Sequence, residues 1–233
     1  MSKRVVTLAH YYTQPEIQQM ADKVGDSLEL SLFARESRAD IIVFAGVRFM
    51  AETAKILNPQ AEVILPDAGS TCSLVTQTDV EALRQWRESH PDHVHVSYIN
   101  SSAAHKALSD WIVTSRNVDD IIAHLYEQGK KVIFSPDRNM GGYLNYQYGY
   151  DMPLWSAVCE VHDKFTEAAL NEALEAARTQ AWQRLPRGVP VEPPAHAVRL
   201  VEGAPFQVLL CAAARALDVE PQEVRRLIGR PAD

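Results

Sequence analysis

The sequence predicts an α/β protein built from repeated three-layer αβα units, with helices covering parallel sheets. Two observations lead to this fold class. Short apolar segments rich in β-branched residues alternate along the chain with amphipathic helical segments. Two long stretches of the chain also align with one another at a constant offset. Strands that are joined through helices run in the same direction, so we expect the sheets to be parallel.

Five short apolar segments are expected to form buried strands. Each is rich in β-branched residues, is bounded by polar or turn residues, and is too short for a helix. These strands are predicted at residues 5–9, 41–45, 63–65, 94–98 and 132–134.

Helical segments separate the predicted strands. Between residues 16 and 24, apolar side chains at Ile17, Met20, Ala21 and Val24 recur at three- and four-residue steps, which places them on one face of a helix. Further helices are predicted at residues 27–38, 47–57, 102–112 and 117–127.

Length and composition limit the class of protein. The chain has 233 residues, of which 46% are hydrophobic, and a net charge of −7. This apolar content supports a sizeable core and excludes a disordered or collagen-like chain. The acidic balance argues against a nucleic-acid partner, because binding to phosphates needs clustered basic side chains.

The sequence predicts a cytoplasmic protein without a membrane segment. No apolar stretch reaches the ~18 residues that suggest a membrane span, and the first residues lack the apolar region of a signal peptide. The three cysteines are odd in number and widely spaced, so they do not form a disulfide framework.

The repeat aligns residues 16–27 with residues 104–115, an offset of 88. Cys72 and Cys159 lie 87 residues apart and close the two copies, so each copy is expected to end in a cysteine on a loop after a strand. The aligned pairs are His10 with Tyr98, Met20 with Leu108, Asp22 with Asp110, and Ser27 with Ser115.

A third copy begins but is not completed. At an offset of 178, residues 24–37 align with residues 202–215, while Cys211 aligns inside a helical stripe and not on a closing loop. Seven of the thirteen prolines follow Trp182, so the composition also changes. We expect α/β units at residues 1–85 and 86–170 and an incomplete, divergent unit at residues 171–233.

Polar and aromatic residues follow two of the predicted strands. His10, Tyr11 and Tyr12 come after the first strand. Tyr98 is the last residue of the fourth strand, and Asn100 follows it. Ligands of open α/β sheets bind beyond the carboxyl ends of strands. Tyr98 could carry a proton and Asn100 could bind a carboxylate. The structural alternatives are a core aromatic pair with a surface histidine, and a helix-capping turn formed by the serines that follow.

Other polar residues have a structural explanation. Ser27 opens a helix, where it could cap the helix or help to bind an anion, and capping is the more common outcome. Met50 follows a strand-to-helix turn and is expected in the core. His90, His93 and His95 are assigned to a polar loop without a function.

Cys72 and Cys159 are the candidate metal ligands. Two thiolates at equivalent ends of two repeats suit a soft metal or an iron–sulfur cluster, although an isolated cysteine is more often a small buried apolar residue. His162 follows Cys159 by three residues and offers an alternative Cys/His nucleophile. No orienting acid or oxyanion hole is identifiable for that alternative.

Five segments between residues 5 and 170 resemble one known family. They read AHYYTQPEIQQMADKVGDSLELS, IIVFAGVRFMAETAKILNP, VSYINSSAAHKALSDWIVTSRN, IFSPDRNMGGYL and LWSAVCEVHDKFT. In this order they are similar to quinolinate synthase, the iron–sulfur enzyme of NAD biosynthesis. The resemblance implies three homologous α/β units around a pseudo-threefold axis, with the active site where the units meet.

The resemblance also implies a reaction. Each unit would give one cysteine to a [4Fe–4S] cluster, whose open iron acts as a Lewis acid. The enzyme would condense iminoaspartate with dihydroxyacetone phosphate, and release quinolinate, water and phosphate. L-aspartate oxidase is the implied functional partner.

Roles carry over by position. Cys72 and Cys159 match the first two cluster ligands. Tyr12 and Tyr98 match tyrosines that take part in acid–base and ring-closing steps. The residues that match the dicarboxylate site are His10, Ser27, Tyr98, Asn100 and Ser115.

The last third of the chain departs from the family pattern. Residues 190–194 stand where a His-Pro-Glu-Cys-like segment is expected, and Gly203 is followed by Ala and Pro in place of Ser and Thr. The third cluster cysteine is absent. An alternative function is therefore a truncated, non-catalytic paralogue that binds a small dicarboxylate or a protein partner.

Overall fold

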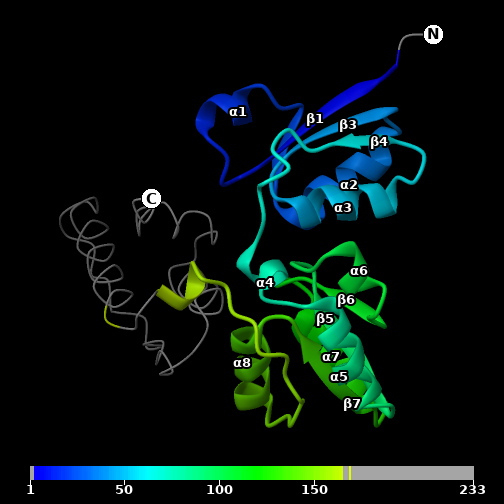
Figure 1. Ribbon diagram of the computed structural model, residues 1–233, viewed down its shortest axis with the longest axis vertical. Helices are drawn as coiled ribbons and strands as arrows, with labels where there is room; N and C mark the ends of the chain where they lie inside the picture. The colour runs from blue at the N-terminus through cyan, green and yellow to red at the C-terminus, as the bar shows by residue number, and fades with distance from the viewer. Residues whose placement is uncertain (1–2, 165–167, 169–233) are drawn as a thin grey trace, which may run out of the picture. The chain divides into compact units, whose positions relative to one another are not determined.

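The computed structural model describes residues 3–164 and residue 168 (Figure 1). These residues fall in two compact units. One contains residues 3–141 and 151–158, and the other contains residues 142–150 and the described residues from 159 onward. The predicted third unit at residues 171–233, with Cys211, lies outside the described residues. The boundaries predicted for the first two units stay a prediction.

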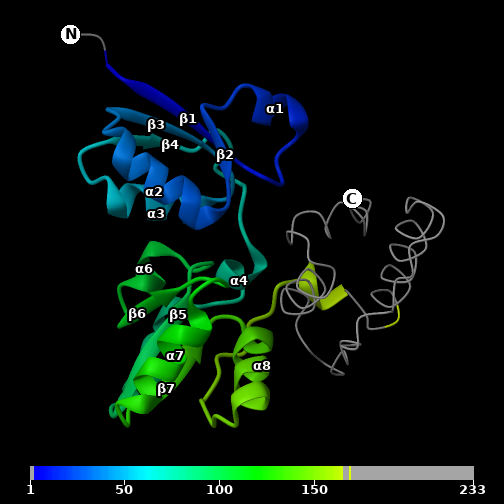
Figure 2. The ribbon, with the colours of Figure 1, turned by 180° about the vertical axis from the view of Figure 1, so that it is seen from behind.

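The first sheet has four parallel strands in the order β2-β1-β3-β4, which confirms a parallel α/β arrangement. Figure 2 shows β2 at its edge. The strands are β1 (Val5–His10), β2 (Lys23–Gly25), β3 (Ile41–Ala45) and β4 (Glu62–Ile64), and the helices are α1 (Pro15–Gln19), α2 (Ser27–Ser37) and α3 (Arg48–Leu57).

The core of this sheet lies between its central strands and the helices α2 and α3. Leu8 of β1 and Phe44 of β3 are fully buried, and they pack in one cluster with Leu30 of α2 and with Phe49 and Met50 of α3. Burial of such side chains contributes roughly 1.5–3 kcal/mol each. The sequence prediction that Met50 belongs to the core is confirmed.

The second sheet has three parallel strands in the order β6-β5-β7. The strands are β5 (His93–Tyr98), β6 (Trp111–Val113) and β7 (Lys131–Ser135). The remaining helices are α4 (Ser73–Thr76), α5 (Val80–Glu88), α6 (Ala103–Lys106), α7 (Val118–Glu127), α8 (Arg138–Tyr148) and the short 3₁₀ helix η1 (His162–Lys164).

The two sheets repeat the same construction. The first and last residues of β5 and β6 lie 88 positions after those of β1 and β2. β1 and β5 also occupy the same place in their sheets, each beside a three-residue edge strand. Helices α1 and α6 also begin 88 residues apart. The offset that the sequence predicts is therefore confirmed by the elements themselves.

Two of the predicted helices are wrong in their second halves. α1 ends at Gln19 and α6 ends at Lys106, and each is followed by a three-residue edge strand, β2 or β6. The apolar residues of each edge strand continue the three- and four-residue spacing of the helix before it, so the sequence pattern predicted one longer helix. The helices predicted at residues 27–38, 47–57 and 117–127 are confirmed within one residue, and all five predicted strands are present.

The assignment of His93 and His95 to a polar loop is also wrong, because His93 is the first residue of β5. His95 lies in β5 and is fully buried. The predicted strand began one residue before it, at Val94. Among the described residues, no helix combines the length and the apolar character that a membrane span requires.

Candidate functional site

The candidate residues lie at the carboxyl ends of the two central strands. His10 is the last residue of β1 and Tyr98 is the last residue of β5, in the same position of the repeat. β1 pairs with β2 through His10 and Gly25, and β5 pairs with β6 through Tyr98 and Val113. The turns that carry Ser27 and Ser115 therefore leave their edge strands beside these two residues.

His10 and Tyr12 stack on one another after β1. Their ring centroids are 4.1 Å apart, and the Tyr12 backbone N–H donates to His10 Nδ1 at 3.4 Å. The Tyr12 hydroxyl is directed toward Met50 Sδ at 3.7 Å. Desolvation of this hydroxyl, with a smaller contribution from nearby Cys72, raises the pKa of Tyr12 to about 12, although the ring as a whole is half exposed. The phenol is therefore protonated at neutral pH.

Asn100 contacts the same cysteine from the other sheet. Its side-chain Nδ2 lies 4.0 Å from Cys72 Sγ, within the range of an N–H···S hydrogen bond. Tyr98, two residues earlier, is 6% exposed. The structure thus brings Asn100, Cys72 and Tyr12 together from three separate segments of the chain.

The turns that carry Ser27 and Ser115 are joined by an ion pair. Arg116 Nη2 lies 2.8 Å from Asp26 Oδ2, so the neighbours of the two serines are in direct contact. Asp26 is also the N-cap of α2, because its carboxylate accepts the backbone N–H of Glu29 at 2.8 Å. The capping role considered for Ser27 therefore belongs to Asp26.

The two candidate cluster cysteines lie in different compact units. Cys72 is half-buried, occupies the N-cap position of α4 and packs against the core of the first sheet. Cys159 is half-buried as well, and its carbonyl accepts the Asp163 backbone N–H at 2.9 Å. The convergence of the two thiols stays a prediction, as does the pairing of Cys159 with His162.

Comparison with known proteins decides the family. The family model described as Quinolinate synthetase A protein matches residues 1–182. The chain belongs to the quinolinate synthase family.

Curated quinolinate synthases are similar to the same part of the chain. The protein of Chlorobaculum tepidum is 50% identical over 168 residues, which cover 72% of this chain and 52% of that protein. The protein of Nostoc punctiforme is 51% identical over 162 residues, or 70% of this chain and 50% of the relative. The chain spans about half the length of the curated quinolinate synthases it matches.

The surroundings of Cys72 suit a thiolate ligand of an iron–sulfur cluster. Cys72 is accessible enough to bind metal, and the Asn100 amide donates toward its sulfur, as hydrogen-bond donors commonly do toward the sulfurs around such clusters. Within residues 3–164, no three His, Cys, Asp or Glu side chains are grouped closely enough to bind a metal ion by themselves. Cys72 and Cys159 are the described residues that would hold the cluster of a quinolinate synthase.

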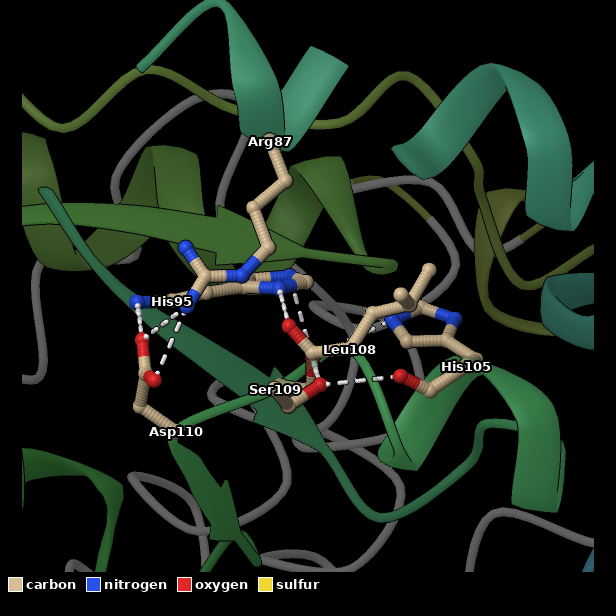
Figure 3. A network of polar contacts seen from close by, with 7 residues as sticks. Arg87, His95, His105, Leu108, Ser109 and Asp110 are labelled. Atoms are coloured by element: carbon tan, nitrogen blue, oxygen red, sulfur yellow. Dashed lines mark hydrogen bonds and ion pairs between the residues drawn. The ribbon is translucent and has the colours of Figure 1, made fainter. Parts of the chain in front are cut away.

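Sequence reasoning missed a buried polar network that includes His95 and His105 (Figure 3). His95 Nδ1 lies 3.0 Å from the Leu108 carbonyl, which only accepts, so Nδ1 carries the proton and Nε2 is the acceptor. The hydroxyl of Ser135 on β7 lies 2.6 Å from this Nε2 and 2.8 Å from His105 Nε2. Ser97 joins the network 3.1 Å from His105. These contacts join β5, β7 and α6.

Burial keeps both histidines of this network neutral. Desolvation lowers the pKa of His105 to about 3, and His95 and Lys106 add to this shift by electrostatic repulsion. Desolvation also lowers the pKa of His95. The alternation of His95 and Ser97 along β5 places both side chains on one face of the sheet, and this is the sequence signal that could have identified them.

Proposed function

We propose that this chain is a quinolinate synthase that binds iminoaspartate at the carboxyl ends of β1 and β5 and condenses it with dihydroxyacetone phosphate, as a step in NAD biosynthesis. Family membership supports the reaction class. The observation that carries the site is the meeting of Tyr12 and Asn100 at Cys72, because these residues come from different segments and share no structural role. An L-aspartate oxidase would supply the unstable imine.

The dicarboxylate would be bound by hydrogen-bond donors from both repeats. The hydroxyls of Ser27 and Ser115 and the amide of Asn100 can each donate to a carboxylate oxygen. The ion pair between Asp26 and Arg116 supports this role, because it holds the two serine turns beside one another. A substrate with two carboxylates would place one at each turn.

Tyr12 would act as a proton donor. Its pKa of about 12 keeps the phenol protonated in the range where the enzyme works, so it can protonate a departing hydroxyl group but does not act as a base in its resting state. Tyr98, which is buried at the end of β5, is proposed for the ring-closing step. The stacking of Tyr12 on His10 would orient its ring.

Cys72 and Cys159 would hold a [4Fe–4S] cluster. When bound, the cluster supplies a Lewis-acidic iron that polarises a substrate oxygen during dehydration. The protein's own contribution at Cys72 is the Asn100 amide, which would stabilise the bound thiolate and link the metal ligand to the dicarboxylate site.

Anaerobic reconstitution of the full chain tests this function. We expect iron and sulfide to bind, a brown iron–sulfur absorption to appear, and quinolinate to form from iminoaspartate and dihydroxyacetone phosphate. Cys72→Ser and Cys159→Ser should each lose most of the bound iron, whereas Cys211→Ser is the control cysteine and should retain it. A wild-type chain that stays colourless under oxygen-free conditions would contradict the proposal.

A second candidate function is dicarboxylate binding without catalysis. It is favoured by the fact that the part of the chain that matches its curated relatives contains the proposed dicarboxylate residues. Calorimetry with L-malate on the cluster-free chain separates the two functions. A chain that binds L-malate but forms no quinolinate after anaerobic reconstitution supports a binding module, and quinolinate formation that Cys72→Ser abolishes supports the metal-dependent enzyme.

A further inference from the structure

A lysine closes the loop that follows β5. Lys106 Nζ donates to the Ile99 carbonyl at 2.9 Å and also to the Ser101 carbonyl. These two carbonyls flank Asn100 on either side. A single ammonium group therefore determines the backbone path on both sides of a residue that the proposed function places at the substrate and at Cys72.

The lysine is itself held by helix α3 of the first sheet. Its ammonium lies 5.5 Å from the centroid of the Phe49 ring, in the range of a cation–π contact. Glu52 Oε2 accepts the backbone N–H of Ala103, at the start of α6, at 2.7 Å. The negative charge of Glu52 also acts on the Lys106 ammonium. Helix α3 thus positions α6, and α6 positions the lysine.

The backbone of the loop has little freedom left once these contacts are made. The Ile99 N–H donates to the Val113 carbonyl of β6 at 2.8 Å, and the Ser101 N–H donates to the Ile99 carbonyl at 2.8 Å. Ser102 caps α6 by accepting the His105 N–H at 3.1 Å. The buried Ser101 hydroxyl has no hydrogen-bond partner among the described residues, so the backbone contacts and Lys106 alone fix this turn.

We propose that Lys106 is a positioning residue for Asn100, and that Lys106 and Glu52 together form a clamp that holds the dicarboxylate-binding loop in its active geometry. The inference rests on the proposed function of Asn100. Two of the three ammonium donors of Lys106 are directed at the loop carbonyls, so its recorded role is to hold the backbone beside Asn100. It acts by keeping the Asn100 amide directed at the ligand and at Cys72 Sγ.

The chain offers a matched control. Lys55 Nζ also donates to two backbone carbonyls, those of Pro59 at 3.1 Å and Ala61 at 2.7 Å, in the connection between α3 and β4. No candidate site residue lies in that connection. Lys55→Met therefore removes the same kind of contact as Lys106→Met without altering the loop at Asn100.

Two measurements on the full, cluster-free chain test the clamp. In Lys106→Met, we expect amide hydrogen exchange to become faster at residues 99–103, while exchange in the core strands β1 and β3 is unchanged. We also expect the Kd for L-malate, measured by calorimetry, to rise on the order of tenfold, because small displacements of a binding group are costly. In Lys55→Met, the Kd should equal that of the wild type, and exchange should change only near residues 58–61.

The outcomes separate the clamp from the proposed function. If exchange at residues 99–103 or the Kd for malate is the same in Lys106→Met as in the wild type, the positioning role is wrong. If the wild-type chain binds no malate, the proposed dicarboxylate site is wrong. The exchange rates at residues 99–103 then decide whether Lys106 holds the loop. Lys106→Gln, which retains one short donor, should give intermediate exchange rates and is the second variant if Lys106→Met does not fold.

Discussion

At the scale of single residues, two aspartates define the start of the edge strands. The Asp22 carboxylate accepts the Thr7 backbone N–H at 2.7 Å, and its own N–H donates to the Thr7 carbonyl at 2.8 Å. Asp110 makes the same two contacts with His95, at 2.8 Å and 2.9 Å. In each repeat, one aspartate thus contacts the central strand twice, through its carboxylate and through its backbone N–H, immediately before the short strand begins.

These aspartates should differ in their effect on stability. The Asp110 carboxylate also accepts hydrogen bonds from Arg87 Nη2 at 2.9 Å and 3.0 Å, whereas among the described residues Asp22 contacts the strand at Thr7 without a basic partner. We expect Asp22→Ala to lower the free energy of unfolding by about 1 kcal/mol and Asp110→Ala by about 2 kcal/mol, because Asp110→Ala also removes the contact with Arg87. Both values are modest because the carboxylates are partly solvated. Urea unfolding measures both. Asp22→Asn, which keeps an acceptor oxygen, is the control and should stay closer to the wild type than Asp22→Ala.

At the scale of elements, the buried network joins β5, β7 and α6 through neutral histidines. The groups that face His105 are His95, the Lys106 ammonium and the hydroxyls of Ser97 and Ser135. None of these is an acid that could balance a charged imidazole. Protonation of His105 would therefore leave an unpaired charge between the sheet and the helix.

The network predicts a loss of stability in acid. The pKa of His105 is about 3 in the folded protein and about 6.5 in the unfolded chain, so the unfolded chain binds more protons between these values. The free energy of unfolding is therefore highest above pH 6.5 and falls as the pH decreases below it. From pH 6.5 to pH 5, His105 should contribute a loss of about 2 kcal/mol.

Urea unfolding at several pH values measures this loss. His105→Asn should reduce the difference in stability between neutral and mildly acidic solution. His124 lies exposed on α7, where its Nε2 is 2.8 Å from the Gln128 amide, and His124→Asn is the matched control. An equal pH dependence in His105→Asn and the wild type would show that this imidazole is not buried in its neutral form.

The elements also show what the sequence could and could not predict. The longer helices and the central strands were predictable, because their apolar periodicity extends over several residues. β2 and β6 were not, since their apolar residues continue the pattern of the preceding helix and their position depends on Asp22 and Asp110 contacting a distant strand. The role of Lys106 depends on loop carbonyls that have no sequence signature.

At the scale of the whole molecule, the repeats are linked by charge as well as by packing. Arg116 and Asp26 are 68% and 33% exposed, so their ion pair is largely solvated and contributes little to stability. We expect Arg116→Ala to lower the free energy of unfolding by about 0.5 kcal/mol at low ionic strength and by close to nothing at ~1 M salt. Unfolding in both solutions measures this difference.

Arg84 provides the matching control for the link between the repeats. It pairs with Glu81 at 3.3 Å within α5, so Arg84→Ala removes an exposed ion pair without separating the repeats. Both variants should show a similar salt effect on stability. If the serine turns bind a dicarboxylate, only Arg116→Ala should also weaken L-malate binding. Equal malate affinity in the two variants would show that the ion pair does not position the turns.

The candidate site was only partly accessible to sequence reasoning. The repeat offset paired His10 with Tyr98 and Ser27 with Ser115, and the strand positions confirm that these pairs are equivalent. The proximity of Cys72 to Asn100 could not be obtained from periodicity, because it joins a loop of the first sheet to a loop of the second.

The register of the repeat has a practical consequence. The stretch from the start of β1 to Ser27 and the stretch from the start of β5 to Ser115 each contain 23 residues, whereas β3 and β7 are offset by 90 residues, two more than the strands before them. The two repeats therefore differ in chain length only after Ser27 and Ser115. Because the two 23-residue stretches have the same length, either one could replace the other without an insertion or deletion. The product would carry the same residues at both strand ends.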